Sequence, residues 1–160
     1  MEMRLPDDFK EFLKLCNAKK LEYMVIGGFA VAHYGYCRPT ADIDIWIRRS
    51  DANAQRMVKV LQAFGFDQPG LNAVLFLEPE KMLRIGVSPV RIEILNDISG
   101  VAFDACYGRR IESRWERVKV PVISLEDLLA NKTASARLKD LIDVESLTGV
   151  NPPEKRRRTS

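Results

Sequence analysis

Two aspartates, Asp42 and Asp44, are the residues of this chain with the clearest capacity for chemistry. They alternate with apolar side chains across residues 41–47, and this alternation predicts a strand that carries both carboxylates on one face. Two carboxylates in this arrangement repel each other, and a bound divalent metal ion offsets the repulsion. We therefore expect the chemistry of the protein to centre on this strand.

A third acid, Glu93, lies in a second predicted strand, residues 90–95, where it shares a face with Arg91 and Leu95. If the two strands are neighbours, three carboxylates converge, and ligands that are all oxygen suit Mg²⁺ or Mn²⁺ rather than Zn²⁺. Two such ions would activate an attacking hydroxyl and neutralise a leaving pyrophosphate. The alternative is a solvent-exposed sheet face on which Glu93 merely pairs with Arg91.

A glycine pair, Gly27 and Gly28, stands between a predicted strand and a predicted short helix. Backbone N–H groups at such a turn form an anion site that suits a nucleoside triphosphate, although a glycine pair alone only eases backbone strain. Arg38 and Thr40, just before the aspartates, are candidates for phosphate or base contacts. The alternative for Arg38 is a solvated loop charge.

The first half of the chain is predicted to alternate helices and strands. A helix runs from Pro6 to near Asn17, and another is capped by Ser50 and ended by Gly65. The strands are residues 21–26 and 41–47, with the short helix 29–34 between them. This order implies a sheet with helices packed on it.

The second half is predicted to add strands and then helices. Residues 73–77 resemble a strand, and 82–87 with 90–95 form a hairpin. A short helix follows at 101–107, and 111–122 form a hairpin or edge strands outside the main core. Ser124 caps a further helix, and the last helix is expected to turn Leu138, Leu141 and Ile142 inward.

Length and composition indicate one ordinary globular domain. The chain has 160 residues, 46% hydrophobic and 29% charged, and we expect a single domain over 1–150 with a basic, disordered tail over 151–160. The net charge of +3 is too small to indicate nucleic-acid binding. Three cysteines without metal-ligand spacing, and no signal-peptide or membrane-span pattern, predict a cytoplasmic protein that does not contact membranes.

The run I-G-G-F-A-V-A-H-Y-G-x-x-R-P-T-A-D-I-D-I, residues 26–45, resembles the signature of the nucleotidyltransferase superfamily typified by DNA polymerase beta. More narrowly, it is similar to the minimal nucleotidyltransferases, including the AbiEii-like toxins and other toxin–antitoxin members. The C-terminal part resembles the narrower group through Leu128-Leu129-x-x-Lys132 and the run R-x-K-D-x-x-D over residues 137–143. The resemblance covers residues from about 20 to 148.

The resemblance implies an α+β nucleotidyltransferase fold: a mixed, twisted sheet with helices packed mainly on one face, plus C-terminal helices. It implies transfer of an NMP from an NTP to the hydroxyl of an RNA 3′ end or a protein side chain. Asp42 and Asp44 would bind both metal ions, and Glu93 the ion nearest the acceptor, where it helps to take the proton. Gly27 and Gly28 would hold the β- and γ-phosphates.

Two positions depart from the family pattern. Glu93 stands where aspartate is commoner, which changes the reach of the carboxylate, and Gly28 stands where serine also occurs, which removes a hydroxyl from the phosphate contact. Lys132 is a further candidate triphosphate ligand, because its helix would pack near the site. Trp46 shares the aspartate face and would either stack on a base or belong to the core.

The remaining charges of the last helix have a structural alternative. Lys139 with Asp143, and Arg137 with Asp140, have the spacing of salt bridges along one helix face. We favour that interpretation for Lys139 and Asp143, and leave Arg137 and Lys132 open.

Several functions stay compatible with the resemblance. The narrower group predicts a place in a toxin–antitoxin or related defence system, with a cognate toxin or antitoxin as partner. The near balance of charge outside the tail favours a protein or small-molecule acceptor over RNA. The alternatives are transfer to a small molecule such as an aminoglycoside, and a non-catalytic nucleotide-binding partner protein.

Overall fold

The computed structural model describes residues 4–37, 40, 42–87 and 90–149. The expected basic tail, 151–160, and the candidate ligand Arg38 lie outside the described residues. Within the described part of the chain, no helix is long and apolar enough to cross a membrane.

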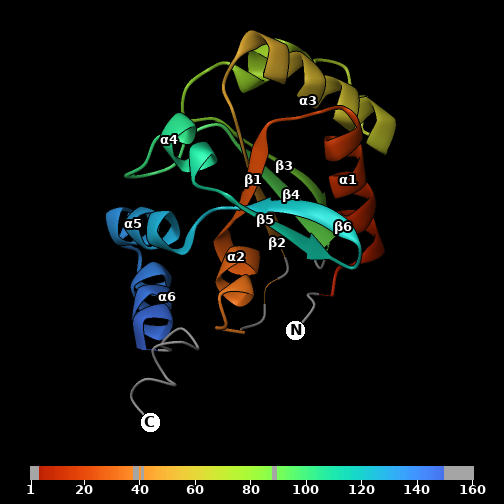
Figure 1. The fold of residues 1–160 in the computed structure, drawn as a ribbon. Coiled ribbons are helices and arrows are strands. Elements are labelled where there is room, and N and C mark those ends of the chain that lie inside the picture. Colours follow the sequence, from red (N-terminus) through yellow and green to blue (C-terminus); the bar gives the residue numbers. More distant parts are fainter. Residues whose placement is uncertain (1–3, 38–39, 41, 88–89, 150–160) are drawn as a thin grey trace.

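The first half of the chain folds as its sequence predicts (Figure 1). Helix α1 spans Asp7–Ala18, and the predicted order continues with β1 (Tyr23–Ile26), α2 (Gly27–His33), β2 (Asp42–Ile47) and α3 (Asp51–Phe64). Ser50 caps α3, since its side chain accepts a hydrogen bond from the backbone N–H of Asn53. Gly65 ends the same helix in the left-handed conformation, with φ of 100°.

The second half contains one wrong prediction of element type. Residues 73–77 were expected to form a strand, but Ala73–Phe76 form a 3₁₀ helix, η1. The side chain of Asn72 caps this helix, because its Oδ1 accepts a hydrogen bond from the backbone N–H of Val74. Only Phe76 of this turn is buried. The other elements are β3 (Met82–Val87), β4 (Val90–Leu95), α4 (Phe103–Gly108), β5 (Ile111–Trp115), β6 (Val118–Val122), α5 (Leu125–Ser135) and α6 (Leu138–Gly149).

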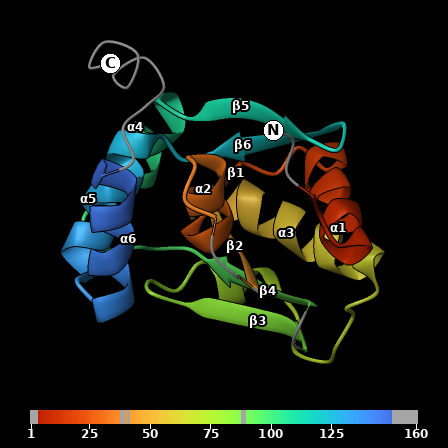
Figure 2. The same cartoon turned by 90° about the horizontal axis from the view of Figure 1, so that it is seen from below.

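Six strands form one mixed sheet in the order β3-β4-β2-β1-β6-β5. The pairs β1–β6 and β2–β4 are parallel, whereas β1–β2, β3–β4 and β5–β6 are antiparallel. Helices α1 and α3 pack against each other on one side of the sheet, and α5 and α6 lie on the other side (Figure 2). The predicted α+β class with a mixed sheet and added C-terminal helices is confirmed.

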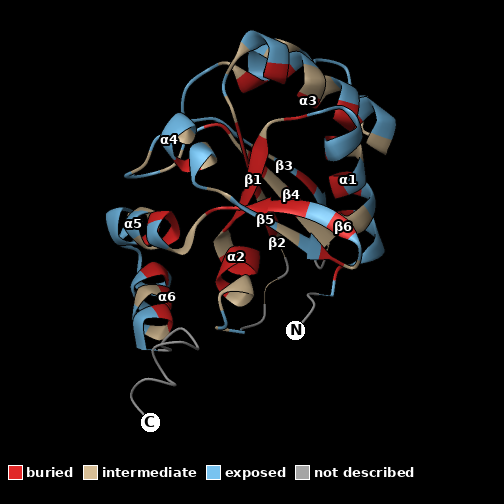
Figure 3. Ribbon diagram, in the orientation of Figure 1, coloured by how far each residue is buried: buried red, intermediate tan, exposed pale blue. Residues whose placement is uncertain are grey.

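The hairpin 111–122 belongs to the main sheet, contrary to the expectation that it lies outside the core. β6 pairs in parallel with β1, with Val25 opposite Val122. Val120 and Val122 are fully buried, and Trp115 of β5 is 1% exposed. Figure 3 shows β1 and much of β6 as buried. The alternating valines of β6, Val118, Val120 and Val122, supply a buried apolar face, and helix α1 packs against this strand.

Helix α6 faces the opposite way from the prediction. Leu138, Leu141 and Ile142 are 76%, 46% and 46% exposed, although they were expected to point inward. The buried residues of α6 include Asp140 and Asp143 instead. Lys132 of α5 is buried between these two acids, so charge pairing rather than apolar burial sets the rotation of α6.

This orientation predicts a large difference between two leucine truncations. Leu128→Ala should lower the free energy of unfolding by about 3 kcal/mol, because Leu128 is fully buried. Leu141→Ala should change it by less than about 0.5 kcal/mol, as expected for an exposed position. Urea unfolding of both variants measures the difference, and equal losses would show that α6 buries its leucines after all.

Candidate active site

The parallel pairing of β2 with β4 brings the predicted acids together. Asp44 lies opposite Glu93 in this pair, and Asp42 lies opposite Arg91. On the other side of β4, β3 places Arg84 opposite Glu93. The predicted adjacency of the two acidic strands is confirmed, and the acids share the sheet face that the isoleucines of β2 leave free.

Each of two acids is paired with an arginine. Arg91 forms a bidentate ion pair with Asp42, in which Nε lies 2.9 Å from Oδ1 and Nη2 lies 3.2 Å from Oδ2. Arg84 donates to Glu93 differently, with Nε at 3.0 Å and Nη2 at 2.9 Å from the same oxygen, Oε1. The suggested pair of Glu93 with Arg91 is therefore replaced by two cross-strand pairs. Glu93 pairs with Arg84 of β3, and Arg91 pairs with Asp42 of β2.

Among the described residues, Asp44 forms no ion pair within salt-bridge distance, unlike Asp42 and Glu93. Its Oδ1 atom is buried and, among the described residues, has no hydrogen-bond partner. Burial, a hydrogen bond with Glu93 and the negative charges of Glu93 and Asp42 raise the pKa of Asp44 to about 8, and Lys139 acts against the rise. The Asp44 carboxyl therefore keeps its proton to a higher pH than an ordinary aspartate does.

The two predicted glycines are required by the acids and by Thr40. Gly27 has a φ of +67°, and a Cβ on it would collide with Oδ2 of Asp44. A Cβ on Gly28 would lie only 2.6 Å from the Thr40 hydroxyl oxygen. The residue before α2 is Ile26, whose side chain gives the helix no cap. Among the described residues, the first N–H groups of α2 therefore lack a side-chain cap and can donate to solvent or a ligand.

Lys132 lies at the site but already has partners. Its Nζ is 2.9 Å from Oδ2 of Asp143 and 3.4 Å from Oδ1 of Asp140, and all three side chains are 5% exposed or less. Arg137 also pairs with Asp140, at 2.7 Å from Nε to Oδ2, as its spacing predicted. Although Asp140 is buried, its hydrogen bonds with Arg137 and Ser135 and the charge of Lys132 lower its pKa to about 2. The favoured pairing of Lys139 with Asp143 stays a prediction; Asp143 is buried, and its Oδ2 lies 2.9 Å from Nζ of Lys132.

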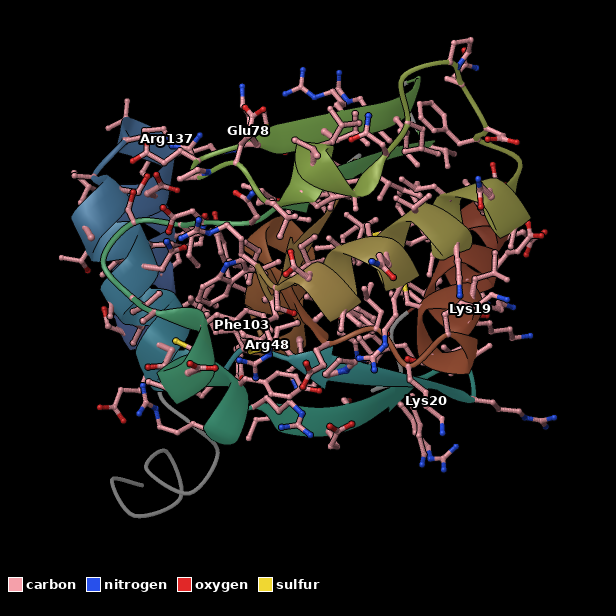
Figure 4. The ribbon with its side chains drawn as sticks, turned by 90° about the horizontal axis from the view of Figure 1, so that it is seen from above. Lys19, Lys20, Arg48, Glu78, Phe103 and Arg137 are labelled. Carbon is pink, nitrogen blue, oxygen red and sulfur yellow. The ribbon has the colours of Figure 1, made fainter. Side chains whose placement is uncertain are left out.

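The described candidate ligands of metal and phosphate line one pocket of about 590 Å³, a volume typical of small-molecule sites. Figure 4 shows Arg137 on the side of the α5–α6 pair that faces the edge strand β3. Trp46 is not available to a base, since it is 1% exposed and packs edge-on against Phe103. The predicted residues that line the pocket are Gly27, Gly28, Thr40, Asp42, Asp44, Glu93 and Lys132.

Sequence patterns alone missed the cation Arg84. It lines the pocket from β3, and nothing in its neighbourhood along the chain marks it as a partner of Glu93. The signal that identifies it is the register of the β3–β4 hairpin, in which Arg84 faces Glu93. Asn131 and Ser135 of α5 also line the pocket without having been predicted.

The donor set suits a hard divalent cation. Within the described residues, no three acidic, histidine or cysteine side chains already stand as a ready set of metal ligands. Two of the three acids are turned toward arginines, which accounts for that arrangement. The buried, unpartnered oxygen of Asp44 and the oxygen-only character of the three acids nevertheless fit Mg²⁺ or Mn²⁺.

A protein-family model described as "Nucleotidyltransferase of unknown function (DUF6036)" matches residues 3–151. The chain belongs to this family. The DUF6036 protein is therefore a nucleotidyltransferase, as its motifs predicted, whereas the narrower AbiEii-like resemblance stays a prediction. Among curated proteins, none matches the chain significantly.

Solved structures share the fold of the DUF6036 protein. A Thermotoga maritima protein assigned as a nucleotidyltransferase, TM1012, aligns with a TM-score of 0.58 and 18% identity over 92% of this chain and 94% of its own. The lincosamide antibiotic adenylyltransferase LnuA aligns at 0.56 and 16% over 92% and 98%. The antibiotic-resistance factor ANT(2'')-Ia aligns at 0.58 and 11% over 93% and 85%. At these identities the likeness shows the fold alone.

The raised pKa of Asp44 predicts that the metal-free protein loses stability as the pH rises. Between the ordinary value of 3.8 and about 8, the folded state keeps a proton that the unfolded chain has released. The free energy of unfolding should therefore fall across this interval. Asp44→Asn should flatten the decline and add at least about 1.4 kcal/mol at its upper end, the equivalent of one pKa unit.

Urea unfolding in chelator across this pH interval makes the measurement. Asp67→Asn, at an exposed loop position, is the matched control and should leave the decline unchanged. An equal decline in Asp44→Asn and in the parent protein would contradict the assignment to Asp44.

The burial of Lys132 predicts a structural effect that a mere phosphate ligand would not have. Lys132→Met should lower the free energy of unfolding by about 3 kcal/mol or more, because two buried carboxylates lose their shared cation. Lys139→Met, at an exposed position of the same pocket, should change stability by less than about 0.5 kcal/mol. Unchanged stability with weaker nucleotide binding in Lys132→Met would instead favour the predicted triphosphate contact.

Proposed function

We propose that the DUF6036 protein transfers an NMP from an NTP to an acceptor hydroxyl with the help of a divalent metal ion. The observation that carries this proposal is the convergence of Asp42, Asp44 and Glu93 on one sheet face, in the pocket that also contains the Gly27 turn. A solvent-exposed row of acids would not be expected to enclose a carboxyl oxygen as Oδ1 of Asp44 is enclosed.

Asp42, Asp44 and Glu93 would hold Mg²⁺ or Mn²⁺, which would supply Lewis-acid charge at the attacking hydroxyl and the leaving pyrophosphate. Glu93 is also suited to accept the proton of the acceptor hydroxyl, because Arg84 contacts its Oε1 and leaves Oε2 unpaired with that arginine. Burial around Asp44 places these charges in a medium of low dielectric, where they act more strongly.

The phosphates would lie at the start of α2. The backbone N–H groups of Gly27 and Gly28 belong to the first turn of this helix and lack a side-chain cap. Thr40 supports the same placement, since its hydroxyl occupies the space into which a side chain at Gly28 would project. Thr40 can thus supply the hydroxyl that the missing serine would bring. Arg38 and Lys132 stay candidate ligands of the nucleotide.

The acceptor we propose is an RNA 3′ end or a protein hydroxyl, within a toxin–antitoxin or related defence system that supplies a cognate partner. This part of the proposal depends on the resemblance of the glycine, D-x-D and C-terminal motifs. A second candidate is a small-molecule acceptor. It is favoured by the fold shared with the lincosamide adenylyltransferase LnuA over 98% of that chain, and by the pocket volume of about 590 Å³, which suits a small molecule.

Transfer of label from nucleotide tests the reaction. The protein is incubated with each α-labelled NTP, Mg²⁺, and in separate reactions total RNA, lysate protein or an antibiotic panel. Asp42→Asn and Asp44→Asn should each reduce labelling at least about 100-fold, because each removes a charge that stabilises the transition state. Asp67→Asn should retain full labelling.

The labelled fraction distinguishes the acceptors. Label in RNA or protein supports the first candidate, and label in an antibiotic supports the second. Nucleotide binding without transfer to any acceptor would favour the non-catalytic alternative. Transfer that survives in both aspartate variants would show that the chemistry lies elsewhere.

A further inference from the structure

Arg91 contacts both carboxylate oxygens of Asp42, and Arg84 contacts one of the two carboxylate oxygens of Glu93. The bidentate contact of Arg91 uses both carboxylate oxygens of Asp42, and Arg84 places two nitrogens on Oε1 of Glu93. The lone pairs of a carboxylate oxygen that face a guanidinium cannot at the same time face a cation. Arginine and metal therefore compete for the lone pairs that face the guanidiniums, on both oxygens of Asp42 and on Oε1 of Glu93.

The two arginines would still face the pocket once the acids had changed partner. Both line it together with Gly27 and Gly28, so each would share the cavity with the phosphates of a bound nucleotide. The planar fork of arginine matches phosphate oxygens as well as it matches a carboxylate. Among the described arginines of the pocket, Arg137 pairs with the buried Asp140, whereas Arg84 and Arg91 pair with the candidate metal ligands.

We propose that Arg84 and Arg91 are exchangeable counter-ions, which neutralise Glu93 and Asp42 before substrate binds and transfer to the nucleotide phosphates when these acids take up metal. The inference rests on the proposed function, because it requires that the acids bind metal. Its consequence is that metal and nucleotide each favour the binding of the other. Metal alone must displace an arginine that has no new partner, and nucleotide supplies that partner.

A purely structural role for these arginines is disfavoured by their exposure. The side chains of Arg84 and Arg91 are 49% and 33% exposed, and ion pairs at such positions contribute little to stability. Both residues also lie outside the glycine and D-x-D motifs, on strands whose apolar faces already hold them in the sheet. Their removal should therefore leave the fold intact and expose their effect on binding.

Calorimetric titration of the full chain with Mn²⁺ tests the proposal without any measure of catalysis. Mn²⁺ is titrated alone and then with the α,β-methylene analogues of ATP, GTP, CTP and UTP, each in turn. Arg91→Met should tighten Mn²⁺ binding alone at least about tenfold, because Asp42 is no longer occupied by a charge-assisted pair. The same variant should weaken binding of the Mn²⁺–nucleotide complex about tenfold, because a phosphate contact is lost.

Further variants separate charge from geometry. Arg84→Met should show the same two opposite shifts through Glu93, and Arg91→Lys should show them in smaller degree, since lysine keeps the charge without the fork. Arg110→Met is the matched control, because Arg110 pairs with Glu112 beside β5, at the opposite edge of the sheet from β3. It should change neither constant. Circular dichroism of each variant confirms that it is folded.

The outcomes separate this inference from the proposed function. Opposite shifts in Arg91→Met support the exchange, and shifts of the same sign, or none, overturn it while leaving the proposed reaction standing. Failure of the parent protein to bind Mn²⁺ even with a nucleotide analogue would overturn the proposed function, and the inference with it.

Discussion

Three carboxylates on one sheet face repel one another, and the residues around them compensate for this repulsion. Parallel pairing of β2 with β4 aligns Asp44 with Glu93 and leaves Asp42 one step along the same face. Arg91 pairs with Asp42, Arg84 pairs with Glu93, and burial with the neighbouring acids raises the pKa of Asp44, which favours its protonated form. Each acid thus has its own means of compensation.

The C-terminal helices contain a second cluster of charged side chains, separate from the three carboxylates of the sheet. Lys132 lies between Asp140 and Asp143 in the interface of α5 with α6, where no side chain of the three is more than 5% exposed. Such a cluster is stable only while all its members are present. It fixes α6 against α5 and so gives the pocket a firm wall opposite the sheet, at the cost of leaving the leucines of α6 in solvent.

Elements with local signals could be predicted from sequence, and those with distant partners could not. Ser50 and Gly65 mark α3 because a cap depends on residues three or four positions away. The place of β6 depends on its pairing with β1, almost a hundred residues earlier, which no pattern within 111–122 records. The same reasoning explains α6, whose leucine spacing predicts a buried stripe until Lys132 is known to lie beneath Asp140.

The candidate site divides in the same way. Gly27, Gly28, Asp42, Asp44 and Glu93 were recognisable because their order along the chain is a motif, and the structure brings them to one pocket. Arg84 was not recognisable, because its importance arises only from the strand register that sets it opposite Glu93. The acceptor has no counterpart among these local signals, since it is selected by the shape and charge of a pocket built from five different segments.

Because Thr40 lies so close to Gly28, the side chains at these two positions depend on each other. A side chain at position 28 would need the space that the Thr40 hydroxyl fills, so the pocket can take its hydroxyl from one position or the other but not from both. Replacement of Gly28 by serine would therefore be tolerated only together with a smaller residue at position 40. Where the serine-containing form of the motif has a hydroxyl on the helix, this chain thus has one on Thr40, in the loop that precedes the aspartates.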